Sequence, residues 1–223
     1  MKAPAKGEAV PSAADRAAAL RLTPVSRETE RRLDAVVSLL LQWQRTTNLI
    51  APASIPHLWT RHVADSLQLL SHVPDSAKTF VDLGSGGGFP GLVLACALAD
   101  RPGAAFHLVE SNAKKCAFLR AAIQDSRLPA TVHCRRIEDF AVDFGSPADV
   151  VTARALAPLH ELVGYVAPLL KSQTVALLPK GQDVATELTQ TTKCWNIEYR
   201  LAPSLTDDNA RIVILTAVTA RRP

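Results

Sequence analysis

The sequence has few cysteines, few aromatic residues and no long apolar run, and each shortage argues against a class of protein. Its four cysteines form no C-x-x-C pair, so we expect reduced core residues and neither a disulfide framework nor a zinc site: Cys96, Cys116, Cys134 and Cys194. No run of about 18 apolar residues occurs, so no transmembrane helix is expected. Aromatic residues make up 5% of the 223 residues, too few for a surface on which single-stranded bases stack.

The overall composition is that of an ordinary globular protein. Apolar residues make up 48% of the chain and charged residues 21%. The formal net charge of +4 permits a nucleic-acid partner without requiring one. Residues 1–13 are rich in Ala, Pro and Lys and contain no continuous apolar segment. We therefore expect a disordered tail, no signal peptide and a cytoplasmic protein.

The stretch Thr79–Gly91, TFVDLGSGGGFPG, is the feature around which the rest of the chain is organised. A short apolar segment containing Asp82 is followed by five glycines within eight positions and then by the apolar run LVLACALA. This order predicts a buried strand, a tight turn and a helix. Glycines in such a turn permit positive φ and let a ligand approach the main chain. The alternative is a glycine-rich turn that binds nothing.

Two kinds of nucleotide site compete for this turn. Residues 86–91 fit the dinucleotide pattern G-x-G-x-x-G, but the Asp82 carboxylate just ahead of the turn would repel a pyrophosphate. The same carboxylate suits a ligand with a cationic amino group and no phosphate, such as S-adenosylmethionine. A phosphate loop is not expected, because no Lys-Ser or Lys-Thr pair follows the glycines.

The chain divides into two regions of different pattern. Residues 14–75 predict a helical segment packed on the core, with helices at 14–22, from an N-cap at Ser26 through Arg45, and at 57–71, and a loop at 46–56. From residue 76 to 223 strands and helices alternate, which predicts a largely parallel sheet covered on both faces. The expected strands are 79–83, 105–110, 131–134, 148–153, 174–179, 194–201 and 211–219, and the expected helices 90–99, 112–126, 158–170 and 182–191. The last two strands are joined without a helix and should form an antiparallel pair at one edge.

Polar residues at the carboxyl ends of these strands form the candidate site, because ligands of such sheets bind there. Glu110 ends the second strand, where a carboxylate accepts hydrogen bonds from ribose hydroxyls; the alternative is a solvated strand end. Ile137 and Glu138 are placed to hold an adenine ring, or else only cap a helical turn. Side chains from separate segments are candidates to bind phosphates, with solvated surface as the alternative for each: Arg61, His62, Arg154, Lys180 and Arg211. Three further cations fall on one helix and are interpreted as a solvated face: Lys114, Lys115 and Arg120.

Five motifs in this order resemble those of a known family. They are Asn48-Leu49-Ile50, Arg61-His62-x-x-Asp65-Ser66, the glycine-rich segment Val81–Gly91, Arg154-Ala155 and Lys180-Gly181. The family is that of the bacterial small-subunit ribosomal RNA guanine-N7 methyltransferases, also called glucose-inhibited division protein B. The resemblance implies an α/β fold of the Rossmann-like class I S-adenosylmethionine-dependent methyltransferases. This fold has a seven-strand, mostly parallel sheet with an antiparallel edge strand, here preceded by N-terminal helices.

The resemblance also implies the reaction and its residues. The donor is S-adenosylmethionine, and the acceptor is N7 of a guanine in the 530 loop of 16S rRNA, position 527, presented as rRNA or as the small ribosomal subunit. The residues implied for the cofactor are Asp82, Gly84, Ser85, Gly86, Phe89, Glu110, Ser111, Ile137, Glu138 and Arg154, and those implied for positioning RNA are Arg61, His62, Arg154, Lys180 and Arg211. Guanine N7 carries a free lone pair at neutral pH, so no catalytic general base is expected. We expect a monomer, with no membrane and no metal as partner.

Other functions stay open on the sequence. A methyltransferase that acts on a small molecule or a protein would share the cofactor site. A non-catalytic RNA-binding module would be expected to lose Asp82, the glycines and Glu110, all of which are present. An NAD-dependent oxidoreductase fits the glycine pattern but not Asp82, and no obvious Tyr-x-x-x-Lys pair for hydride chemistry is found.

Overall fold

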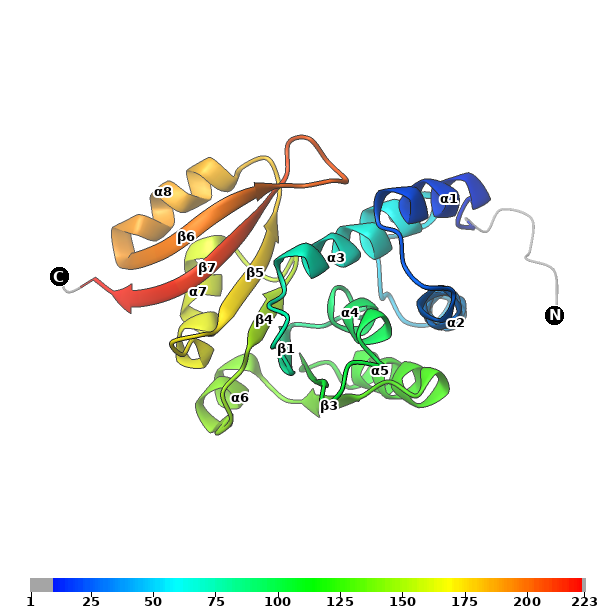
Figure 1. The fold of residues 1–223 in the computed structure, drawn as a ribbon, viewed down its shortest axis with the longest axis horizontal. Coiled ribbons are helices and arrows are strands. Elements are labelled where there is room, and N and C mark those ends of the chain that lie inside the picture. Colours follow the sequence, from blue (N-terminus) through cyan, green and yellow to red (C-terminus); the bar gives the residue numbers. More distant parts are fainter. Residues whose placement is uncertain (1–9, 222–223) are drawn as a thin grey trace.

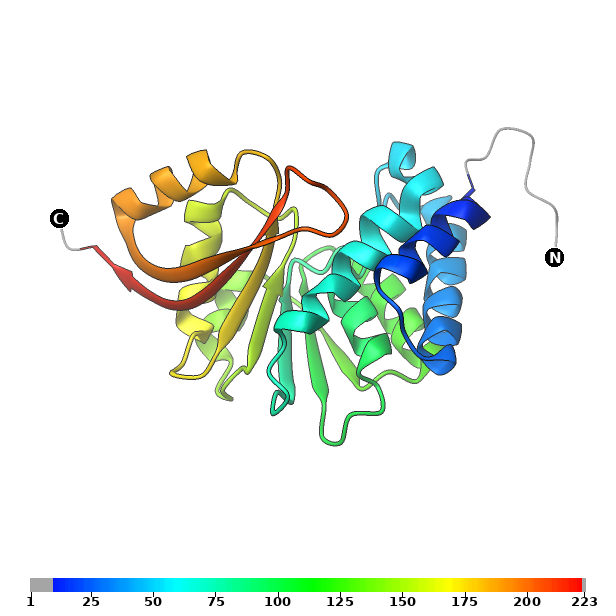
Figure 2. The same cartoon turned by 45° about the horizontal axis from the view of Figure 1, so that its top comes forward.

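Seven strands form one sheet, and helices cover both of its faces (Figures 1 and 2). The strands are β1 (Thr79–Leu83), β2 (Ala105–Glu110), β3 (Ala130–Cys134), β4 (Val150–Ala153), β5 (Val175–Lys180), β6 (Trp195–Pro203) and β7 (Arg211–Ala220). The computed structural model describes residues 10–221. The order in the sheet is β3-β2-β1-β4-β5-β7-β6. Every predicted strand is found. The inner strands are apolar runs, whereas the predicted strand at 194–201 is more polar.

The first five strands are parallel, and the predicted antiparallel pair of β6 and β7 is confirmed. The antiparallel strand is β7, which lies between β5 and β6 with Lys180 opposite Arg211. The burial of the two strands explains this order. Residues 212–215 of β7 are each at most 1% exposed, whereas most of β6 is exposed or half-buried. The strand that is apolar on both faces therefore occupies the inner place, and the polar one forms the edge.

All four helices predicted after β1 are found, with one further helix between β3 and β4 that was not predicted. Before β1, the helices predicted at 14–22 and from an N-cap at Ser26 are found, and the third differs from prediction. They are α1 (Ala13–Leu22), α2 (Arg27–Gln44), η1 (Pro52–His57), η2 (Trp59–Ala64), α3 (Asp65–Leu67), η3 (Gln68–His72), α4 (Gly91–Ala97), α5 (Ala113–Ser126), α6 (Ile137–Asp143), α7 (Leu159–Val166), η4 (Ala167–Leu169) and α8 (Val184–Cys194). Ser26 caps α2 as predicted, since its Oγ accepts a hydrogen bond from the Thr29 amide at 3.1 Å.

Two predictions in the N-terminal region are corrected by the structure. The loop predicted at 46–56 contains the 3₁₀ helix η1, in which Pro52 occupies the first turn, where its missing N–H costs nothing. The predicted helix at 57–71 is three short pieces, of which η2 is π-helical. The predicted tail lies mostly outside the described residues, but its end does not: Ser12 caps α1, which begins at Ala13.

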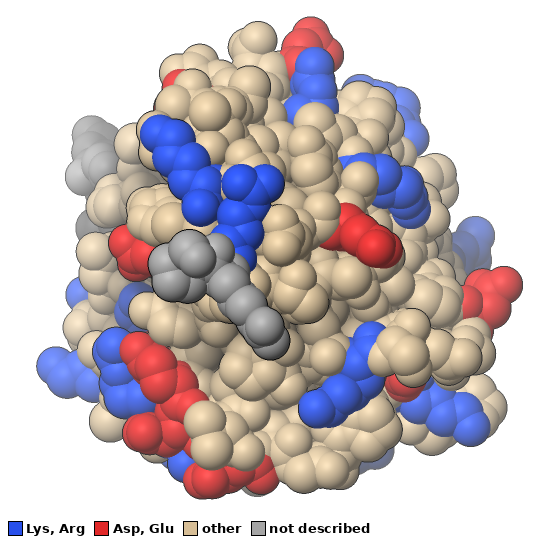
Figure 3. Space-filling view, turned by 90° about the vertical axis from the view of Figure 1, so that its left-hand side faces the viewer, with Lys and Arg blue, Asp and Glu red and all other residues tan. Residues whose placement is uncertain are grey.

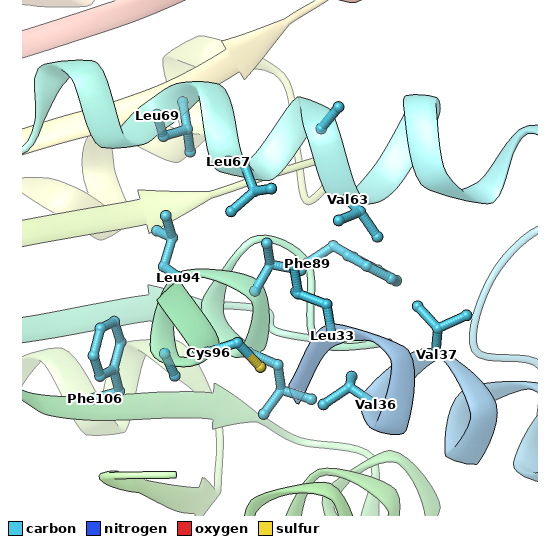
Figure 4. Packing of buried hydrophobic residues seen from close by; sticks show 14 of the residues in the cluster. Leu33, Val36, Val37, Val63, Leu67, Leu69, Phe89, Leu94, Cys96 and Phe106 are labelled. Carbon is cyan, nitrogen blue, oxygen red and sulfur yellow. The ribbon is translucent and has the colours of Figure 1, made fainter. Parts of the chain in front are cut away.

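The two faces of the sheet carry separate apolar clusters. On one face, Leu33 and Val36 of α2 lie beside Cys96 of α4, and the same cluster extends to Leu94 and to Phe106 of β2 (Figure 4). The other face is covered by α6, α7 and α8. Leu33 is 1% exposed, and burying a side chain of this size stabilises the fold by about 2 kcal/mol. The N-terminal helices thus share one core with the sheet.

The cysteines are all free thiols, but only two of them are in the core. Cys96 and Cys116 are fully buried, and burial raises the pKa of each thiol to about 12. Cys134 and Cys194 are exposed, so the prediction of a core position is wrong for these two. Cys134 ends the outer strand β3, and Cys194 is the last residue of α8, so neither has a neighbouring element on its outer side.

Candidate functional site

The glycine-rich turn after β1 has a backbone that other residues rarely adopt. Gly84 has φ +68° and Gly86 has φ +52°, both in the left-handed region. A Cβ on Gly84 would also lie 2.6 Å from Cδ1 of Leu156, in the loop after β4. Glycine is therefore required at Gly84 for both conformation and space, and the turn packs closely against the loop of the neighbouring strand.

A cavity of about 640 Å³ opens above the carboxyl ends of β1, β2 and β4. From β1 the chain adds β2 and β3 on one side, and from β4 it adds the later strands on the other side. The cavity therefore lies at the topological switch point of the sheet. The volume is typical of a site for a small molecule or nucleoside. Among the predicted site residues, those that line it are His62, Gly84, Ser85, Gly86, Phe89, Glu110, Ser111, Ile137, Glu138 and Arg154.

Glu110 connects the glycine-rich turn to the start of α5. Its Oε2 accepts a hydrogen bond from the Gly86 amide at 3.0 Å, and its Oε1 accepts one from the Asn112 amide at 2.7 Å. The residue is 9% exposed. Each carboxylate oxygen has a second lone pair, so the fixed carboxylate keeps capacity for the hydroxyl groups of a ligand.

Asp82 lies behind the turn and does not line the cavity. It is 2% exposed, and its Oδ1 accepts a hydrogen bond from Thr152 Oγ1 at 2.7 Å. Its Oδ2 has no hydrogen-bond partner among the described residues and faces Gly91, where a Cβ would lie 2.5 Å away. Burial raises the pKa of Asp82 to about 6, although the Thr152 hydrogen bond lowers it. A direct contact with the amino group of a ligand stays a prediction.

Arg154, after β4, is held by a cluster of groups at the cavity wall. Its Nη1 donates to Asp65 Oδ2 at 3.0 Å and to the Arg61 carbonyl at 2.9 Å, and its Nη2 lies 2.7 Å from His62 Nδ1. The guanidinium lies 5.3 Å from the centroid of the Phe89 ring, on which the His62 ring stacks at 4.9 Å. The structure thus brings four of the predicted residues together, Arg61 through its carbonyl and the others through their side chains. Asp65 is a site residue to which the sequence reasoning gave no role.

The other two predicted cations lie apart from this cluster. Lys180 forms an ion pair with Glu187, Nζ to Oε2 at 2.6 Å, and donates to the Ala157 carbonyl at 3.1 Å. Arg211 donates to two carbonyl groups of the loop before β7, both at 2.7 Å. Neither lines the cavity. Lys180 instead fixes the loop after β4, whose residue Ala157 does line it.

The N-terminal region contributes a wall that the sequence reasoning missed. The segment from Leu49 to Ala51 lines the cavity. Gln44, at the end of α2, holds it: Oε1 accepts from the Leu49 and Ile50 amides at 2.9 and 3.0 Å, and Nε2 donates to the Ile50 carbonyl at 2.7 Å. The only available signal was the Asn48-Leu49-Ile50 motif. Lys115 also lines the cavity, so its assignment to a solvated face is corrected.

The fold is that of the Rossmann-like class I methyltransferases. The structure matches the cofactor-bound Rv0187 protein of MTB with a TM-score of 0.62 at 15% identity, covering 92% of this chain and 98% of that one. It matches a ribosomal protein L11 methylase of Lactobacillus delbrueckii subsp. bulgaricus with a TM-score of 0.54 at 11% identity, covering 73% and 79%. At these identities the likeness shows the fold alone.

The chain belongs to the rRNA small subunit methyltransferase G family, whose pattern matches residues 29–210. Two relatives carry the name ribosomal RNA small subunit methyltransferase G. That of Bradyrhizobium sp. (strain BTAi1) is 60% identical over 206 residues, 92% of each chain. That of Nitrobacter hamburgensis is 57% identical over 221 residues, 99% of this chain and 85% of that one.

Residues 10–221 lack two further features. None of the described helices is long and apolar enough to span a membrane. No group of three or more His, Cys, Asp or Glu side chains in this part of the chain is arranged to hold a metal ion.

Proposed function

We propose that the protein transfers a methyl group from S-adenosylmethionine to N7 of a guanine in the 530 loop of 16S rRNA. Family membership supports the reaction class. The observation that carries the proposal is that one cavity joins the glycine-rich turn and Glu110 to the Arg154 cluster. The part around Glu110, here called the nucleoside end, has groups that suit a nucleoside. The part around Arg154, here called the acceptor end, has hydrogen-bond donors that suit an acceptor base.

The nucleoside end fits an adenosyl ligand. The fixed carboxylate of Glu110 is suited to ribose hydroxyls, and the turn from Gly84 to Gly86 allows close approach of the ligand to the main chain. Glu138 lines the cavity. The pKa of its carboxyl is lowered by a hydrogen bond from its own backbone N–H and, to a smaller extent, by the charge of Arg136. Glu138 is then an anionic acceptor for the exocyclic amine of adenine. When bound, S-adenosylmethionine supplies an electrophilic methyl group on a sulfonium.

The acceptor end suits a base that becomes cationic on methylation. The charge of Arg154 is balanced by Asp65 at 3.0 Å, in a pair whose side chains are 15% and 17% exposed. Burial, with a smaller effect of Arg154 and Arg61, lowers the pKa of His62 to about 3, so its ring is neutral. The Arg154, Asp65 and His62 side chains thus offer N–H donors and together carry no net charge. Guanine N7 needs no general base, so the protein contributes mainly by positioning, with the reacting atoms held about 3 Å apart.

The rim of the cavity has cations that suit RNA phosphates. Lys115, Arg135 and Arg136 line the opening, and Arg136 is exposed. Contacts of this kind fix orientation and do not read the base. On the end of the molecule that lies on the left in Figure 1, Lys and Arg side chains are dispersed among uncharged and acidic residues (Figure 3). We therefore assign RNA binding to the cavity rim, in a monomer that acts in the cytoplasm.

The test is methyl transfer from labelled S-adenosylmethionine to small subunits that lack the modification, followed by borohydride and aniline cleavage at N7-methylguanine. A single cut in the 530 loop is the expected result. Label in RNA without such a cut would overturn the N7 assignment, and no label in RNA despite cofactor binding would favour a small-molecule or protein acceptor. A variant in which Arg136 is replaced by Ala should show a weaker dependence of RNA binding on salt.

A further inference from the structure

Three hydrogen bonds run in one direction from Arg154 to η1. Nη2 of Arg154 lies 2.7 Å from Nδ1 of His62, Nε2 of His62 lies 2.9 Å from Oγ of Ser54, and that hydroxyl donates to the Ala51 carbonyl at 2.7 Å. A guanidinium has donors only, so Nδ1 of His62 must be the acceptor. The proton of the neutral imidazole is then on Nε2, and Oγ of Ser54 accepts the hydrogen bond from this N–H. The first donor therefore fixes the direction of every bond and the tautomer of the ring.

The surroundings of His62 keep the ring in this arrangement. It stacks on Phe89, which is 5% exposed and lies next to Val63 and Val37 (Figure 4). Ser54 is 6% exposed. A proton on Nδ1 would turn that atom into a donor facing the guanidinium and break the bond to Arg154. The π-helical turn of η2 presents His62 to the cavity, and such turns are frequent at functional sites.

We infer that His62 is a positioning residue that, as the neutral Nε2–H tautomer, orients the Arg154 guanidinium toward the acceptor and exchanges no proton during the reaction. The inference rests on the proposed function. Arg154 is gripped from three sides, by Asp65, the Arg61 carbonyl and His62. Of these, only the bond to His62 is made by Nη2, so its loss would leave that arm of the guanidinium without this contact. Misplacement by about 1 Å at a reacting centre can cost about 100-fold in rate.

The kinetic test compares His62→Phe, His62→Gln and wild type in single-turnover methyl transfer to small subunits lacking the modification. Phe keeps a ring against Phe89 but forms neither hydrogen bond, so we expect the methyl-transfer rate to fall about 10- to 100-fold while the affinity for S-adenosylmethionine stays within about twofold. Gln can accept from Arg154 and donate to Ser54, and should restore part of the rate. The exposed His57 in η1 provides the control, since His57→Phe should leave the rate unchanged.

A second readout does not depend on activity. Nitrogen-15 NMR of the His62 ring should show a protonated Nε2 and an unprotonated Nδ1 from pH 5 to pH 8. The opposite tautomer, or a doubly protonated ring in this range, would overturn the inference. So would a His62→Phe enzyme as fast as wild type. No methyl transfer to RNA by the wild-type protein would instead overturn the proposed function, and with it the catalytic part of this inference.

Discussion

Nη1 of Arg154 lies 3.0 Å from Oδ2 of Asp65, and this ion pair connects the loop after β4 to α3, 89 positions earlier in the chain. The other oxygen of Asp65 accepts from Gln68 Nε2 at 2.8 Å and from Thr206 Oγ1 at 2.9 Å. The loop between β6 and β7 extends toward α3 in Figure 2 and is attached there by these bonds. One carboxylate therefore joins three segments around the cavity.

Replacement of Asp65 by Asn should be strongly destabilising. It leaves the mostly buried guanidinium of Arg154 without its counter-charge, and breaking such a pair costs about 3 kcal/mol. Urea unfolding at pH 7 measures the loss, with the exposed Asp125→Asn as control. Methyl transfer should fall in the variant that still folds. A change below about 0.5 kcal/mol would show that the pair contributes little.

The pKa of His62 predicts acid sensitivity of the fold. Burial lowers this pKa from 6.5 to about 3, so below pH 6.5 the unfolded chain binds a proton that the folded protein does not. The contribution of His62 to stability is therefore complete above pH 6.5 and is lost as pH falls toward 3. Between pH 7 and pH 5 the loss is about 2 kcal/mol. His62→Gln should lack this loss, which urea unfolding across the range can measure. Parallel curves for the two proteins would contradict the prediction.

Asp82 predicts the opposite dependence on pH. Burial raises its pKa from 3.8 to about 6, so between these values the folded protein holds a proton that the unfolded chain has lost. Its contribution to stability is greatest below about pH 4 and declines as pH rises through 6, by about 3 kcal/mol in all. Unfolding of Asp82→Asn should show a stability gain relative to wild type that grows from pH 4 to pH 7.

Titration of Asp82→Asn and wild type with S-adenosylmethionine at pH 8 tests the predicted ligand role separately. Weaker binding by the variant is expected only if that role holds.

Asp15 of α1 provides an N-terminal cap for η2, although α1 precedes the residues matched by the family. Its Oδ2 accepts from the Trp59 and Thr60 amides at 2.9 and 3.3 Å, and its Oδ1 accepts from the Thr60 hydroxyl. Asp15→Ala should cost about 1–2 kcal/mol, as for other helix caps. Thermal unfolding measures this, and the exposed Asp75→Ala should cost little. Equal stabilities of the two variants would exclude a capping role.

The sequence predicted the strands and the position of the cavity, because both depend on local pattern. The run around Val81 and the glycines after it define a strand and its turn without reference to the rest of the chain. The partners of individual side chains could not be predicted. Lys180 was expected to face RNA, yet Glu187 of the following helix neutralises it and directs it to the β4 loop.

The surroundings of single side chains were equally beyond the sequence. The buried strand that contains Asp82 was predicted, but not that Gly91 at the start of α4 lies against its carboxylate and helps to enclose it. The order of β6 and β7 also depends on a comparison between strands. The more apolar strand, β7, takes the inner position, and this can be seen only when the two strands are compared with each other.

The inner position of β7 has a consequence for how the chain folds during synthesis. β5 can pair with β4 as soon as both have left the ribosome, but its other edge waits for residues 211–220. Until then the apolar row from Ala176 to Leu178 is an open strand edge, of the kind that pairs with foreign strands. The emerging chain is therefore most exposed to misassembly after β5 and α8 are made, and completion of β7 ends that interval.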